Sequence, residues 1–100
     1  MSKVRIKFDT DNEEINKKVY EYNPELTMKE LLESFLRETN SRTEAKVEDI
    51  QFIYKGKILN SPEFQEKKAK EIFRFQNHKV KVWDSKNIIG GMNNIFYFYL

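Results

Sequence analysis

The chain has 100 residues, of which 39% are hydrophobic and 34% are charged. This length is typical of one domain, and the composition is too apolar for a disordered tail and too polar for a membrane protein. The formal charge of +2 is nearly balanced, which does not favour a nucleic-acid-binding protein. The absence of Cys and the single His exclude thiol catalysis, disulfides and Cys- or His-rich metal sites.

The two ends of the chain indicate where the protein works. Residues 1–5 contain no apolar segment of the kind that a signal peptide needs. The longest apolar run, Ile95 to Leu100, is much shorter than the roughly 20 residues of a membrane-spanning helix. We therefore expect an intracellular protein of the cytoplasm or nucleus. We also expect it to be a monomer.

The first part of the chain predicts two strands and a long helix. Residues 3–8 alternate between polar and apolar, which is typical of a half-buried strand, and the polar residues 9–14 predict a hairpin loop. Residues 17–22 predict a second strand with both tyrosines on one face. A capping-box sequence precedes apolar residues at helical spacing, so we expect a helix over residues 28–39.

The second part of the chain predicts three further strands. Residues 50–54 form one strand, a tight turn follows at residues 55–57, and Ile58-Leu59 begins a short strand. Ser61-Pro62 resembles the start of a helical turn, with Ser as the N-cap and Pro at the first helical position. Residues 79–83 alternate again and predict the last strand, and His78 is interpreted as a turn residue.

This order of elements predicts an α+β fold, with the first and last strands side by side and parallel. The apolar face of the helix is expected to pack against the apolar faces of the strands. The predicted core contains Met28, Leu31, Leu32, Phe35, Val4, Ile6, Phe8, Tyr20, Tyr22, Phe52, Val80 and Val82. The sequence contains no phosphate loop, metal motif or catalytic motif, so we expect no enzymatic activity and no cofactor.

Several of these features resemble ubiquitin. They are the element order, the entry to the helix at Pro24-x-x-Thr27, the segment Phe52 to Leu59, and Gly90-Gly91 after the last strand. The resemblance implies a ubiquitin-like β-grasp: a mixed sheet of four to five strands on one main helix, with a short second helix before the last strand. The resemblance covers about Lys3 to Gly91, so we expect a ubiquitin-like domain of residues 1–91 and an aromatic C-terminal extension of residues 92–100. Three loops are longer than in that family, and the glycine at the end of the helix is missing.

The resemblance places a partner-binding surface on the sheet. Ile53 matches the recognition isoleucine of the family, Lys81 and Trp83 match its neighbours on the last strand, and Lys57 matches a lysine used for chain building. Alternation independently places Lys81 and Trp83 on the outer face. An exposed Trp beside an Ile is a plausible binding anchor, although residues 88–89 or the aromatic extension are alternative covers for it.

Gly90-Gly91 has two interpretations. In a conjugatable modifier, the precursor is cut after Gly91, which is then joined to lysines of target proteins. Alternatively, the two glycines form a turn that lets residues 92–100 pack along a sheet edge, and the apolar Ile88-Ile89 favours this second interpretation. Left exposed, the segment Phe96 to Tyr99 is prone to aggregate.

Two functions therefore compete, and a third is disfavoured. The first is a ubiquitin-like domain that binds partner proteins of the ubiquitin pathway without a covalent bond. The second is a modifier precursor processed after Gly91. The third, a nucleic-acid-binding or enzymatic α+β domain, conflicts with the balanced charge and the missing motifs.

Overall fold

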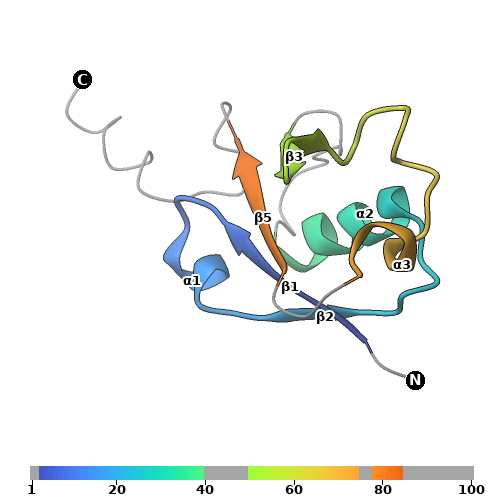
Figure 1. The fold of residues 1–100 in the computed structure, drawn as a ribbon. Coiled ribbons are helices and arrows are strands. Elements are labelled where there is room, and N and C mark those ends of the chain that lie inside the picture. The colour runs from blue at the N-terminus through green and yellow to red at the C-terminus, as the bar shows by residue number, and fades with distance from the viewer. Residues whose placement is uncertain (1–2, 40–49, 75–77, 85–100) are drawn as a thin grey trace.

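A computed structural model describes residues 3–39, 50–74 and 78–84 of the chain. They form an α+β structure in which a five-stranded mixed sheet has the order β2-β1-β5-β3-β4 (Figure 1). The strands are β1 (Val4–Asp9), β2 (Tyr20–Tyr22), β3 (Gln51–Tyr54), β4 (Lys57–Ile58) and β5 (His78–Trp83). The predicted parallel pairing of β1 and β5 is confirmed, and the other strand pairs are antiparallel.

The described residues contain three helices, whereas one main helix and a short second helix were predicted. These are α1 (Glu13–Asn16), α2 (Met28–Thr39) and α3 (Ala69–Ile72). The bounds predicted for α2 are confirmed. Its capping box is formed as predicted: the Thr27 hydroxyl accepts from the Glu30 amide at 3.2 Å, and the Thr27 amide donates to the Glu30 carboxylate at 2.9 Å.

The core lies between α2 and one face of the sheet. Phe35 of α2 stacks on Phe8 of β1 with ring centroids 3.9 Å apart, and it meets Tyr20 and Phe52 edge to face. Every residue of the predicted core is buried. The structure adds core residues that the prediction did not include: Ile15, Leu36, Ile50, Tyr54, Leu59, Ala69 and Phe73.

The prediction of a hairpin loop over residues 9–14 is wrong, because α1 begins at Glu13. Asn12 caps this helix by accepting a hydrogen bond from the Glu14 amide at 3.0 Å. Ile15 is only 4% exposed and anchors the turn to the core, which makes the helix favourable despite its polar sequence. The second strand is correspondingly shorter than predicted and begins at Tyr20.

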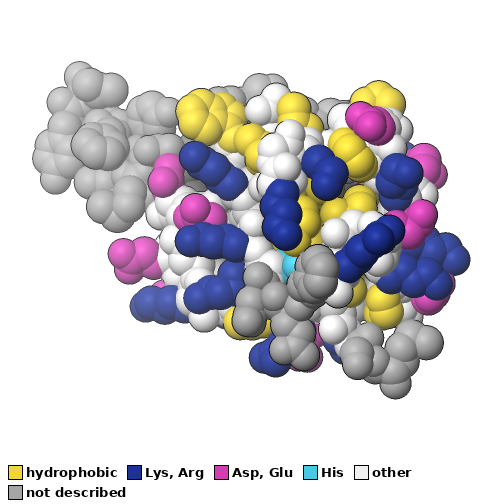
Figure 2. All heavy atoms as spheres, in the orientation of Figure 1, with side chains coloured by type: hydrophobic (Ala, Val, Ile, Leu, Met, Phe, Trp, Pro, Cys, Tyr) yellow, Lys and Arg dark blue, Asp and Glu magenta, His cyan; other side chains and the backbone are white. Residues whose placement is uncertain are grey.

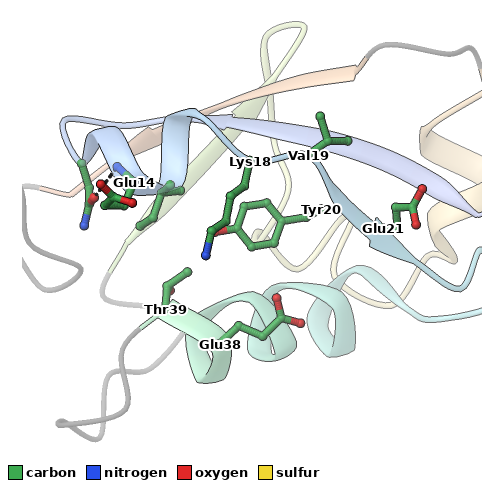
Figure 3. A pocket seen from close by; sticks show the side chains of 9 residues that line it. Glu14, Lys18, Val19, Tyr20, Glu21, Glu38 and Thr39 are labelled. Atoms are coloured by element: carbon green, nitrogen blue, oxygen red, sulfur yellow. Dashed lines mark hydrogen bonds between the residues drawn. The ribbon is translucent and has the colours of Figure 1, made fainter.

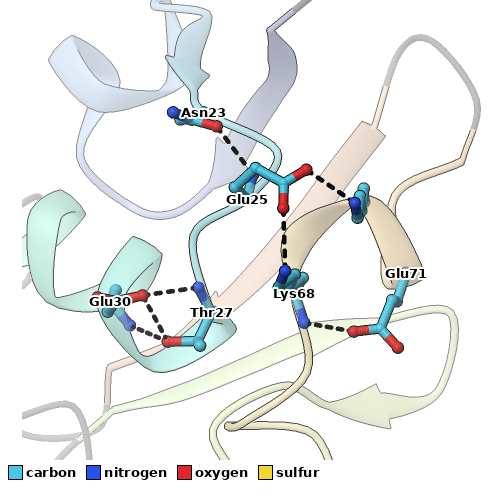
Figure 4. A network of polar contacts seen from close by, with 7 residues as sticks. Asn23, Glu25, Thr27, Glu30, Lys68 and Glu71 are labelled. Carbon is cyan, nitrogen blue, oxygen red and sulfur yellow. Dashed lines mark hydrogen bonds and ion pairs between the residues drawn. The ribbon is translucent and has the colours of Figure 1, made fainter.

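The prediction of a helical turn at Ser61-Pro62 is confirmed only as a hydrogen-bonded turn, because the helix of this region, α3, begins later, at Ala69. The Ser61 carbonyl accepts from the Gln65 amide at 2.9 Å, but no helix continues from it. Backbone hydrogen bonds join α3 to the segment before α2, with the Ala69 amide donating to the Leu26 carbonyl at 2.7 Å. Glu25 adds exposed ion pairs with Lys68 at 3.0 Å and Lys70 at 2.7 Å (Figure 4).

A two-residue turn joins β3 to β4. Lys55 and Gly56 both have positive φ, at 49° and 79°, which matches the twist of the adjoining strands. The turn fixes the register of the hairpin, with Tyr54 opposite Lys57 and Ile53 opposite Ile58. A turn was predicted here over residues 55–57, but it is one residue shorter, because Lys57 already belongs to β4. Its length determines which side chains of β4 share a face with β3.

His78 is not a turn residue, and that interpretation is wrong. It is the first residue of β5, is 5% exposed, and shares the buried face with Val80 and Val82. Its Nδ1 atom lies in hydrogen-bonding contact with the Tyr54 hydroxyl at 2.9 Å. The alternation of β5 thus extends one residue further back than the apolar residues alone indicate.

Candidate functional site on the outer face of the sheet

The sheet face opposite α2 presents exposed side chains from all five strands. Because side chains alternate along each strand, these residues point away from the buried core. In the space-filling view of Figure 2, the visible face of the molecule has Lys and Arg side chains next to hydrophobic ones. The exposed residues of the outer face include Arg5, Lys7, Asp9, Glu21, Gln51, Ile58, Lys79, Lys81 and Trp83.

The structure brings the predicted residues Ile53, Lys81 and Trp83 close together. Ile53 lies directly opposite Lys81 in the antiparallel pairing of β3 and β5, and Trp83 lies two residues further along β5. Trp83 is 58% exposed, whereas Ile53 is half-buried. Ile58 on the other side of Ile53 is 41% exposed, and sequence reasoning missed it. We call Ile53, Ile58, Lys81 and Trp83 the apolar surface.

Of the other predicted site residues, the structure describes Lys57 but not the two glycines. Lys57 is exposed on β4, next to Ile58 in the chain, but it lies opposite Tyr54 and so alternates away from the apolar surface. Gly90 and Gly91, together with residues 92–100 and the apolar residues 88–89, lie outside the described residues. The two interpretations of the Gly-Gly pair therefore stay predictions.

A small depression of about 290 Å³ lies on the same side of the sheet, towards β2. Its lining comes from β1, from β5 and from the residue before β2, and sequence reasoning missed it because these segments are distant in the chain. We call it the basic depression, and its lining residues are Arg5, Lys7, Val19, His78 and Lys79.

A larger cavity of about 540 Å³ lies at the β2 edge, between this strand and the end of α2 (Figure 3). Lys18 reaches towards α2 in this view, and Glu38 extends from α2 into the same space. The lining also contains Glu14 and Glu21, so it mixes both signs of charge. Three carboxylates and one lysine give this lining a formal excess of two negative charges, which disfavours an anion. No ion pair is formed between two of the described lining residues.

Two buried tyrosines lie on β2, and the first of them, Tyr20, lines this cavity. Burial, and secondly the negative charge of Glu38, raises the pKa of Tyr22 well above its ordinary value. The same two causes raise the pKa of Tyr20. Both hydroxyls therefore stay protonated at neutral pH, and the buried Tyr22 hydroxyl has no hydrogen-bond partner among the described residues. Neither tyrosine is suited to act as a base.

The described segments contain no group of His, Asp and Glu side chains arranged to hold a metal ion. Among the same segments, none of the helices combines the length and apolarity needed to cross a membrane. Searches against protein-family models, curated proteins and solved structures found no match to this chain. No relative therefore assigns a role to any residue of the outer face.

Proposed function

We propose that the chain is a ubiquitin-like β-grasp domain that binds partner proteins non-covalently through the apolar surface, and that it is not an enzyme. The observation that carries this proposal is the exposure of Trp83 diagonal to Ile53 on the outer face, with the exposed Ile58 on the far side of Ile53. Large apolar side chains that are exposed in a cluster mark interaction sites more often than isolated ones do.

The arrangement of the sheet supports the fold part of the proposal. A β-grasp pairs its first and last strands in parallel and packs one long helix across the sheet, and β1, β5 and α2 have these relations. Because α2 packs on the opposite face, the main helix leaves the outer face of the described sheet uncovered. The position of Ile53 in the centre of β3 also agrees with the resemblance to ubiquitin.

The composition of the apolar surface supports the binding part. Trp is among the residues that dominate binding energy at protein interfaces, and it contributes most when neighbouring side chains exclude water from it. Ile53 supplies such a neighbour, Ile58 extends the apolar area beyond Ile53, and Lys81 adds a charge at the border. We therefore expect partners with an apolar anchor flanked by an acidic side chain.

The test measures binding of the full chain to a panel of purified ubiquitin-receptor modules by calorimetry. The double variant Ile53→Ala/Trp83→Ala should lose most of the affinity, since truncating a central anchor costs about 2 kcal/mol or more. The matched control is Ile72→Ala, a partly buried isoleucine of α3 that lies outside the apolar surface. Circular dichroism must show that all variants keep the fold.

Two results contradict the proposal. Unchanged binding in the double variant, with the fold intact, moves the site elsewhere. Incubation of the tagged chain with cell lysate and ATP separates the competing function: a covalent ladder that disappears in Gly91→Ala identifies a conjugated modifier. Our proposal expects no such ladder.

A further inference from the structure

The basic depression places two lysines side by side without a neutralising partner. Lys7 of β1 lies directly opposite Lys79 of β5 in the parallel pairing, and neighbouring strands are only about 4.8 Å apart. Like charges in such positions destabilise a sheet. In the part of the chain that the structure describes, neither lysine forms an ion pair.

The next pair along the same two strands shows the contrast. Lys81 of β5 lies opposite Asp9 of β1, so this neighbouring lysine has a carboxylate beside it. The repulsion is thus confined to Lys7 and Lys79, which line the depression. A local arrangement that opposes stability is most readily explained by a binding function.

Arg5 adds a third cation to the lining. It pairs with Glu21 at 3.4 Å, but both side chains are more than half exposed, so the pair is weak and can rearrange. Three cations and this single carboxylate leave a formal excess of two positive charges around the depression. A phosphate monoester carries about −1.5 to −2 charges at neutral pH and accepts several hydrogen bonds, so it matches this excess better than a carboxylate does.

The size of the depression limits the ligand. A volume of about 290 Å³ lies at the lower limit of pockets for small molecules, which are roughly 300–1,000 Å³. It has room for a single charged group and the side chain that carries it, and Val19, which is 46% exposed, offers an apolar contact to that side chain. A nucleic-acid backbone needs a longer basic stripe, which Asp9 and Glu21 interrupt.

We propose that the basic depression binds the phosphate monoester of a phosphorylated side chain on a partner protein. Lys7 and Lys79 hold the phosphate oxygens, and Arg5 turns from Glu21 towards the same group. The proposal does not depend on the ubiquitin-like function, because these residues lie outside the apolar surface. Each of the two proposals can therefore fail while the other holds.

The test titrates the isotope-labelled full chain with the peptide acetyl-Gly-Gly-phosphoserine-Gly-Gly-amide and follows the amide resonances. We expect shifts at Arg5, Lys7, Val19 and Lys79, and none with the unphosphorylated peptide. The double variant Lys7→Gln/Lys79→Gln should bind at least about tenfold more weakly. The matched control Lys29→Gln/Lys67→Gln removes the same charge from exposed sites elsewhere and should bind as the unaltered chain does.

A stability measurement checks the same site without following the resonances. Because removing one of two like charges relieves repulsion, Lys7→Gln should raise the melting temperature of the free protein. The phosphopeptide should raise the melting temperature of the unaltered chain and leave that of the double variant unchanged.

Three results overturn the proposal. The first is equal binding of the phosphorylated and unphosphorylated peptides, or equal binding by the double variant. The second is inorganic phosphate shifting the same resonances at the same concentration as the peptide, which indicates a site for the free anion. The third is tighter binding of an oligothymidylate to the same residues, which indicates a nucleic-acid site.

Discussion

Tyr54 and His78 meet on the buried face of the sheet, where the tyrosine hydroxyl lies 2.9 Å from the histidine Nδ1. Phe73 packs against both rings, with centroids 4.8 Å and 5.0 Å away. Burial, and secondly the positive charge of Lys55, lowers the pKa of His78. The imidazole is therefore neutral in the folded protein at neutral pH.

This arrangement predicts a loss of stability in weak acid. As the pH falls below about 6.5, the histidine of the unfolded chain binds a proton more readily than the buried one does, so unfolding becomes more favourable. The free energy of unfolding should fall with a slope of at most about 1.4 kcal/mol per pH unit. Urea titrations between about pH 7.5 and about pH 5 measure it.

His78→Gln provides the control, because glutamine does not titrate and still offers a partner to the Tyr54 hydroxyl. No other histidine is present. The pKa values of Glu25 and Glu30 are lowered, by hydrogen bonds from lysines and from Thr27 respectively, so their effects fall at lower pH. Equal pH slopes for the variant and the unaltered chain contradict the prediction.

The turn between β3 and β4 gives a second prediction. A methyl group at Gly56 would meet no atom within 4 Å, so a loss of stability in Gly56→Ala can come only from its φ of +79°. We expect a loss of about 1–2 kcal/mol, the energy that a left-handed conformation adds for an ordinary residue.

Lys55→Asn tests the same turn in the opposite direction. Asn tolerates a positive φ better than Lys does, and Asn-Gly is the preferred sequence for this type of turn. Chemical denaturation should therefore show that Lys55→Asn is at least as stable as the unaltered chain. A clear loss in this variant would mean that the contact of Lys55 with the Tyr54 ring, at 5.4 Å, matters more than the backbone.

The parts of the fold that could be predicted depend on local signals. The helix α2 begins at a capping box and continues with apolar residues at helical spacing, so neighbouring residues contain all the information needed. In contrast, α1 depends on Ile15 reaching a core that distant residues build. A single apolar residue in a polar segment does not predict such a contact.

The same difference between local signals and distant contacts applies to the residues of the candidate sites. Alternation identified Lys81 and Trp83 as exposed, because that pattern is contained within one strand. The part played by Ile58 follows from the hairpin register, and the meeting of Lys7 with Lys79 follows from the parallel pairing of the first and last strands. The register of β1 and β5 depends on the whole core, so residue spacing could not predict that meeting. The hairpin register is local, and Ile58 was missed because the turn was predicted one residue too long.

The core prediction concerns Phe35. This side chain is fully buried and contacts the rings of Phe8, Tyr20 and Phe52. Phe35→Ala should lower the free energy of unfolding by about 3–5 kcal/mol, because it removes buried apolar surface and leaves a cavity. Arg37→Ala, on the exposed side of the same helix, should change it by less than about 0.5 kcal/mol. Similar losses in both variants would contradict this placement.

The last prediction separates binding from stability at Ile58. This side chain is 41% exposed and lies opposite Ile53. In the proposed function, its role is to exclude water from the contact between Ile53 and the partner. Ile58→Ser should change the free energy of unfolding by less than about 0.5 kcal/mol. It should weaken binding to the receptor modules by about fivefold, which corresponds to about 1 kcal/mol.

Val19→Ser is the matched control for Ile58→Ser, since Val19 is similarly exposed but lies in the basic depression. This variant should keep full affinity for partners that use the apolar surface. If both variants weaken binding equally, the partner covers the whole outer face, and the apolar surface is not a separate site. If neither does, Trp83 and Ile53 must bind without the neighbour that the hairpin register places beside them.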